Sequence, residues 1–319
     1  MPNRLQKKES IMGKRVFMFP GQGAQYVGMG KEFYDTMPEV KAIYEKASEV
    51  TGLDIPALCF TENDQINITE YTQIAMVTTE AAIFTALRLK GIEADVTAGL
   101  SLGEYGALIA AGVLSMEDAF ALVRKRGIYM QEAVPTGGAM SAVLGLDGAI
   151  IDEICTKTAE EMNQVVSVAN YNCPGQIVIT GAQEAVEKAG ERCKEAGAKR
   201  VVALKVSGPF HSQMLKEAGI KLEESLAEVN VNDPQIPYLA NVTADYVTTK
   251  EPIKELLAKQ VCAPVKWQQT VERLIADGAD EFVEIGPGRT LCGFLKKINR
   301  DVTAVNIDTM EDFNKYVNR

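Results

Sequence analysis

Ser101 stands between two glycines in the pattern Gly99-Leu100-Ser101-Leu102-Gly103. An apolar run over 96–100 comes before it and helix-forming residues over 104–111 follow, which predicts a strand, a tight turn and a helix. Such a turn projects the serine hydroxyl out of the sheet, and the first free N–H groups of the helix face any anion formed beside it. The alternative is a packed turn whose glycines only let strand and helix approach. We interpret Ser101 as a candidate nucleophile and the Leu102 N–H as a candidate oxyanion donor.

The chain contains one histidine, His211, in the predicted turn Gly208-Pro209-Phe210-His211-Ser212 ahead of an amphipathic helix expected from about Gln213. A serine hydroxyl is a weak nucleophile until a base takes its proton, and imidazole has a suitable pKa. A lone histidine can also be a structural residue. If Ser101 needs an imidazole base, however, that base is His211.

Arg126 falls within the apolar stripe of a helix predicted from Ser115 to about Ala133. Its neighbours three and four positions away on the helix are not acidic: Leu122, Val123, Tyr129 and Met130. Because a guanidinium keeps its proton when buried, Arg126 must meet either a distant acid of the fold or an anionic ligand.

A glycine-bordered loop, Pro20-Gly21-Gln22-Gly23, follows the first predicted strand over 14–19. It lacks the third glycine of the dinucleotide-binding fingerprint, and the chain contains no phosphate-binding GxxxxGK motif. The loop is either a plain turn or the source of a second oxyanion donor, the Gln22 N–H.

The remaining elements predict an α/β protein with an inserted small domain. Strands over 139–146, 165–169, 176–180 and 200–206 and helices over 149–162 and 183–196 follow one another as βαββαβ, the ferredoxin-like order. Strands and helices alternate on both sides of this segment. We therefore expect a discontinuous large domain over 14–137 and 207–319, a small domain over 138–206, and a disordered tail over 1–13.

Composition narrows the function classes. The formal net charge of −10 disfavours nucleic acid and anionic membranes as partners, and the uncharged stretch over 133–146 is too short to span a bilayer. The six cysteines are at least 18 positions apart, unlike zinc or CxxC spacings. We expect a cytoplasmic protein with reduced thiols, no metal site and no membrane span.

These motifs, together with Ile285-Gly286-Pro287-Gly288, closely resemble the malonyl-CoA:acyl carrier protein transacylase family in order and spacing. The resemblance implies an α/β-hydrolase-like large domain with a ferredoxin-like small one. It makes Ser101 the acyl-accepting nucleophile, His211 its base and Arg126 the residue that binds the malonyl carboxylate. It also implies that the backbone N–H groups of Gln22 and Leu102 form the oxyanion hole, that the main-chain carbonyl of Gln260 orients the histidine, and that an asparagine in 170–175 faces the substrate.

The expected activity is ping-pong transfer of a malonyl group from malonyl-CoA, through serine, to the phosphopantetheine thiol of acyl carrier protein, for fatty acid or polyketide synthesis. No metal or redox cofactor is expected, and we expect a monomer. Basic residues are candidates for holding the two anionic partners: Lys199, Arg200, Lys205, Lys296 and Lys297. Two alternatives remain: a serine esterase or thioesterase with the same Ser–His pair, and a non-catalytic module that binds carrier protein.

Overall fold

A computed structural model describes residues 13–206 and 208–319. The predicted tail lies outside these residues apart from Gly13, and so does Ser207, the predicted start of the second large-domain segment.

The large domain is built on a six-stranded sheet in the order β10-β9-β1-β2-β7-β8. All neighbouring pairs are parallel except β7 and β8. β1 carries four buried apolar residues in succession, as expected for a parallel strand covered on both faces. The strands are β1 (Lys14–Phe19), β2 (Val96–Gly99), β7 (Tyr238–Ala240), β8 (Asp245–Val247), β9 (Ala279–Ile285) and β10 (Thr303–Ile307).

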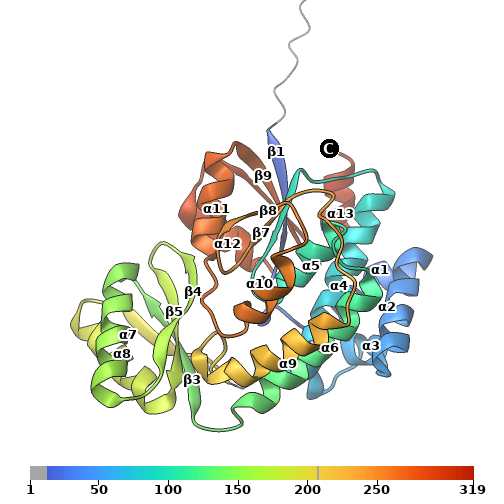
Figure 1. Cartoon of the computed structure of the whole chain (residues 1–319). Helices are drawn as coiled ribbons and strands as arrows, with labels where there is room; N and C mark the ends of the chain where they lie inside the picture. The colour runs from blue at the N-terminus through green and yellow to red at the C-terminus, as the bar shows by residue number, and fades with distance from the viewer. Residues whose placement is uncertain (1–12, 207) are drawn as a thin grey trace, which may run out of the picture.

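Helices cover both faces of this sheet (Figure 1). Phe17 and Phe19 of β1 point to one face, where both rings contact Phe84 of the long helix α4. Val16 and Met18 point to the other face and join the apolar cluster of α11 and α12. The helices are α1 (Lys31–Thr36), α2 (Pro38–Thr51), α3 (Ile55–Phe60), α4 (Thr69–Leu89), α5 (Gly103–Ala110), α6 (Met116–Ala133), α9 (Lys216–Ala227), α10 (Ile253–Gln260), α11 (Trp267–Ala276), α12 (Thr290–Ile298) and α13 (Met310–Val317), with short 3-10 helices η1 (Gln65–Asn67) and η2 (Gln213–Leu215).

The small domain is a four-stranded antiparallel sheet in the order β4-β5-β3-β6, which is the ferredoxin-like arrangement. In Figure 1 its helices lie on the outer side of the sheet, away from the large domain. On the inner side, Met140 and Ala142 pack into the core of the large domain. The elements are β3 (Gly138–Leu144), α7 (Gly148–Met162), β4 (Val166–Cys173), β5 (Gln176–Ala182), α8 (Gln183–Glu195) and β6 (Arg200–Ala203).

Three of the boundaries predicted above are wrong by three residues or more. β4 continues to Cys173 instead of ending at Ala169, because it forms a tight hairpin with β5 and its backbone also bonds with Val265 of the large domain. β6 ends at Ala203 instead of Val206. After His211 the chain first forms the 3-10 turn η2, so α9 begins at Lys216.

Within the described part of the chain, no helix is long and apolar enough to cross a membrane. In the same residues, no three His, Cys, Asp or Glu side chains are grouped so that they could hold a metal ion. All six cysteines carry free thiols.

Candidate active site

Ser101 occupies a strained turn between β2 and α5. Its φ of 53° lies in the left-handed region, which non-glycine residues rarely adopt. Both flanking glycines are required because other backbone segments pass close to them. A Cβ on Gly99 would overlap the backbone of Gly103, and one on Gly103 would overlap the carbonyl of Phe19. The GxSxG pattern therefore builds a turn that lifts the serine above the carboxyl end of the sheet, as a nucleophile requires.

His211 is placed to act on this serine. Its Nε2 lies 2.7 Å from Ser101 Oγ, and its Nδ1 lies 2.8 Å from the main-chain carbonyl oxygen of Gln260. A carbonyl oxygen only accepts, so Nδ1 carries the proton and Nε2 is free to accept the serine proton. His211, like Ser101, has a positive φ, 59°. Backbone strain at both residues thus accompanies the hydrogen bond between them.

Burial keeps this imidazole neutral. Desolvation, followed by the charge of Arg126, lowers the pKa of His211 to about 4, and its backbone hydrogen bonds oppose the shift. The ring is only 4% exposed. Near neutral pH, His211 is therefore in the unprotonated form that a general base needs.

Arg126 reaches the site from α6 and is 1% exposed. Its Nη1 donates to the side-chain oxygen of Gln73 (2.7 Å), and its Nη2 donates to that of Gln260 (3.0 Å) and, more weakly, to Ser101 Oγ (3.4 Å). The Nε–H has no hydrogen-bond partner among the described residues, and none of the ion pairs formed by those residues includes Arg126. Arg126 therefore forms no direct ion pair with an acid in the described part of the fold, which favours the other alternative, an anionic ligand.

Two further side chains that the sequence analysis did not predict hold the site in place. Gln73 on α4 accepts a hydrogen bond from Arg126, as described above. Asn241, just after β7, binds the turn: its Oδ1 accepts from Ser101 N–H (2.6 Å) and its Nδ2 donates to the Gly99 carbonyl (2.6 Å). Asn241 thereby holds the strained turn from both sides. The Gln260 side chain adds a third bond by donating to the Ser101 carbonyl (2.9 Å).

The Gln22 loop lies against this turn. The backbone N–H groups of Gln22 and Leu102 form no hydrogen bond with another described residue, and both residues line the same cleft. Gln22 is held through its side chain, which donates to Thr69 Oγ1 (3.0 Å). Two N–H groups at the mouth of the turn are thus free for an oxyanion.

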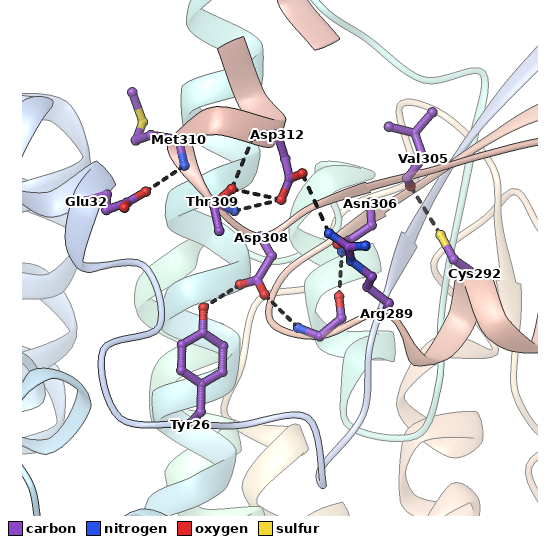
Figure 2. A network of polar contacts seen from close by, with 11 residues as sticks. Tyr26, Glu32, Arg289, Cys292, Val305, Asn306, Asp308, Thr309, Met310 and Asp312 are labelled. Carbon is purple, nitrogen blue, oxygen red and sulfur yellow. Dashed lines mark hydrogen bonds and ion pairs between the residues drawn. The ribbon is translucent and has the colours of Figure 1, made fainter. Parts of the chain in front are cut away.

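A shared carboxylate fixes the far end of this loop (Figure 2). Tyr26 donates its hydroxyl to one oxygen of Asp308 (2.8 Å), and the Gly288 N–H donates to the other (3.1 Å). The Gly286-Pro287-Gly288 turn therefore has a structural role: it is tied, through Asp308, to the loop that carries Gln22.

A cleft of about 700 Å³ opens over Ser101 between the two domains. Gln22, Gln73, Arg126 and His211 line it on the large-domain side. On the small-domain side it is lined by Met140, Asn170, Asn172, Val178, Leu204, Lys205 and Val206. Both asparagines of the predicted substrate-facing segment thus border the cleft, from β4 instead of a loop.

Comparison with known proteins identifies the family. The model of the acyl transferase domain matches residues 16–310. A malonyl CoA-acyl carrier protein transacylase from Bacillus subtilis is 45% identical over 302 residues, which cover 94% of this chain and 95% of that protein. The chain belongs to the malonyl CoA-acyl carrier protein transacylase family.

Solved structures of this transacylase family have the same fold. The enzyme from Clostridium perfringens superposes with a TM-score of 0.92 at 45% identity, covering 96% of each chain. A malonyl-transacylase in complex with a holo acyl-carrier protein of a type II PKS gives 0.92 at 39% identity, covering 96% of this chain and 99% of that one. The predicted fold class, an α/β-hydrolase-like domain with an inserted ferredoxin-like domain, is confirmed for this transacylase family member.

Proposed function

We propose that this protein transfers a malonyl group from malonyl-CoA to the phosphopantetheine thiol of acyl carrier protein, in fatty acid or polyketide synthesis. The observation that carries the proposal is the buried guanidinium of Arg126, which pairs directly with no carboxylate among the described residues. It lies 3.4 Å from the hydroxyl of a serine bonded to a neutral histidine. Family membership supports the same activity.

In the first half-reaction Ser101 becomes acylated. His211 Nε2 takes the hydroxyl proton as Oγ attacks the thioester carbonyl carbon. The oxyanion accepts hydrogen bonds from the N–H groups of Gln22 and Leu102, each worth about 3 kcal/mol by analogy with other oxyanion donors. The C–S bond then breaks, and the CoA sulfur leaves with the proton held by His211.

In the second half-reaction the same groups act in reverse. His211 takes the proton of the phosphopantetheine thiol, and the sulfur attacks the acyl-serine. Ser101 Oγ leaves and recovers its proton from His211. Because every step exchanges one acyl ester for another, the reaction is redox-neutral, and we propose that it uses no metal or redox cofactor.

Arg126 would give the acyl specificity. The unpaired Nε–H and the remaining Nη hydrogens are available to a carboxylate, which a guanidinium binds with two parallel hydrogen bonds. An acetyl group leaves these buried donors unpaired, and a buried unpaired donor is costly.

Lys205 is the basic residue best placed for the anionic partners, since it is exposed and also lines the cleft. The other four candidates do not line this cleft, and Lys297 is bonded to the side chain of Gln176. Ser101, His211 and Arg126 all come from one chain, which supports a monomer as the working unit. The free thiols support a cytoplasmic location.

The test is to incubate the protein with malonyl-CoA, with and without holo acyl carrier protein. We expect a malonyl adduct on the Ser101 peptide by mass spectrometry that persists until the carrier is added and then moves to the carrier thiol. Rapid release of free malonate would instead indicate a thioesterase. The absence of an adduct would indicate a non-catalytic binding module.

A further inference from the structure

Glu104 is a buried carboxyl group that the mechanism above does not use. It lies in the first turn of α5, three residues after Ser101, and is 1% exposed. Its Oε2 accepts from the side-chain amide of Gln260 (2.6 Å) and from the Asn241 N–H (3.4 Å). Its Oε1 has no hydrogen-bond partner among the described residues.

The Gln260 amide connects this carboxyl to the substrate-binding cation. Its Oε1 accepts from Arg126, and its Nε2 donates to Glu104. Each end of the amide is thus fixed by the partner that it can bind. Arg126 and Glu104 are held close, but one neutral group separates them, so neither forms the direct ion pair that would satisfy it.

The charge on Glu104 changes what Arg126 offers to a ligand. With Glu104 ionised, the two residues sum to zero, and a substrate carboxylate would leave one uncompensated negative charge in a buried site. With Glu104 protonated, Arg126 is the only charge of this pair, and the substrate carboxylate neutralises it. Buried net charge is strongly unfavourable, so the two protonation forms differ in their affinity for an acyl carboxylate.

The tyrosines and the histidine near Glu104 keep one charge state across the neutral range. Tyr105 on the same helix and Tyr238 on β7 have pKa values raised by burial, that of Tyr105 to about 12. His211, across Arg126, is neutral because its pKa is lowered. On α4, Glu80 lies against Gly106 of α5, and burial raises its pKa well above the usual range. Burial also raises the pKa of Glu104, to about 8, against its hydrogen bonds and the charge of Arg126.

We propose that Glu104 is a specificity-determining residue: the site accepts a carboxylate-bearing acyl group when Glu104 is protonated and disfavours it when Glu104 is ionised, whereas an uncharged acyl group is accepted equally by both forms. This rests on the proposed function, in which Arg126 pairs with the malonyl carboxylate. Binding of that carboxylate then draws a proton onto Glu104.

The first test is the pH profile of kcat/KM for acylation of Ser101, measured from pH 6 to 9.5 with malonyl-CoA and with acetyl-CoA. In the wild type, the malonyl value should fall about tenfold for each pH unit above the pKa of Glu104, while the acetyl value should not fall. Glu104→Gln, which cannot ionise, should abolish the fall. Glu80→Gln, which removes the other buried carboxyl near α5, should retain it.

The inference is overturned if Glu104→Gln keeps the alkaline fall, or if acetyl and malonyl rates fall together in the wild type. A second measurement needs no variant: at a pH just above the pKa of Glu104 in the free enzyme, malonylation should take up more protons than acetylation, by up to about one per site. Equal proton uptake for the two acyl groups also overturns it. If the wild type forms no malonyl-serine at all, the proposed function itself fails, whereas normal malonyl preference without these pH effects removes only the role of Glu104.

Discussion

Replacing Arg126 with alanine should remove malonyl specificity without destroying the acylation chemistry. The guanidinium is almost fully buried and is held by Gln73 and Gln260, and its removal leaves Ser101 and His211 bonded to each other. What it removes is the only group in the proposed mechanism that pairs with a free acyl carboxylate.

The size of the effect follows from the burial. Removing one partner of a buried ion pair costs about 3–5 kcal/mol, which corresponds to a loss in kcat/KM for malonyl-CoA of roughly a hundredfold to several thousandfold. The acetyl group has no carboxylate, so the variant leaves no buried anion without its cation. Acetyl-CoA loses only the long contact between Arg126 Nη2 and Ser101 Oγ and the orientation of Gln260, so its change should stay within about tenfold.

The assay is single-turnover acylation of Ser101 with each acyl-CoA in turn. The matched control is Arg124→Ala, on the same helix, because Arg124 is paired with Glu70 and lies outside the cleft. That control should change neither rate by more than a few fold. If Arg126→Ala lowers kcat/KM equally for malonyl-CoA and acetyl-CoA, Arg126 does not bind the malonyl carboxylate and only maintains the structure of the site.

Three further predictions test the surroundings of the serine. Because protonated His211 cannot accept the serine proton, kcat/KM should fall as pH falls through about 4. If kcat/KM of the folded enzyme already falls near pH 6.5, burial does not lower the pKa of His211 as described. Asn241→Ala removes two hydrogen bonds that hold the strained turn, and it changes no residue that lines the cleft. We therefore expect kcat to fall about tenfold to a thousandfold while KM stays nearly constant. A rise in KM alone would contradict this. Neither buried carboxyl oxygen of Glu80 has a hydrogen-bond partner among the described residues, and burial raises its pKa, so the wild type loses stability as pH rises above the ordinary carboxyl range. Glu80→Met should therefore raise the free energy of unfolding in urea by about 1–3 kcal/mol, more at pH 9 than at pH 5. An unchanged or lower free energy would contradict this.

Continuous or periodic apolar patterns made much of the fold predictable. The first strand was predicted with its exact bounds because four apolar residues in succession are buried. The position of Arg126 in an apolar helical stripe correctly indicated an interior cation. Other elements were missed. Among them, β10 alternates at the sheet edge with only two buried residues, and α1 and α3 are six residues each.

The polar part of the site was less accessible to sequence reasoning. Asn241 acts on a serine 140 positions away, and Gln73 on an arginine 53 positions away. The sequence spacing of these pairs predicts neither contact, because each contact forms only when β2 packs beside β7 or α4 packs beside α6. The available hints were local: Asn241 follows a strand at the carboxyl edge of the sheet, and Gln73 is a polar residue within an apolar helix.

The most direct measurement is a competition on the wild-type enzyme between equal concentrations of malonyl-CoA and acetyl-CoA, quenched before turnover and read as adducts on the Ser101 peptide. Because the buried Arg126 forms no ion pair within the described residues, we predict a malonyl adduct in excess by roughly a hundredfold or more. Equal amounts of the two adducts would contradict the claim that Arg126 selects the acyl group.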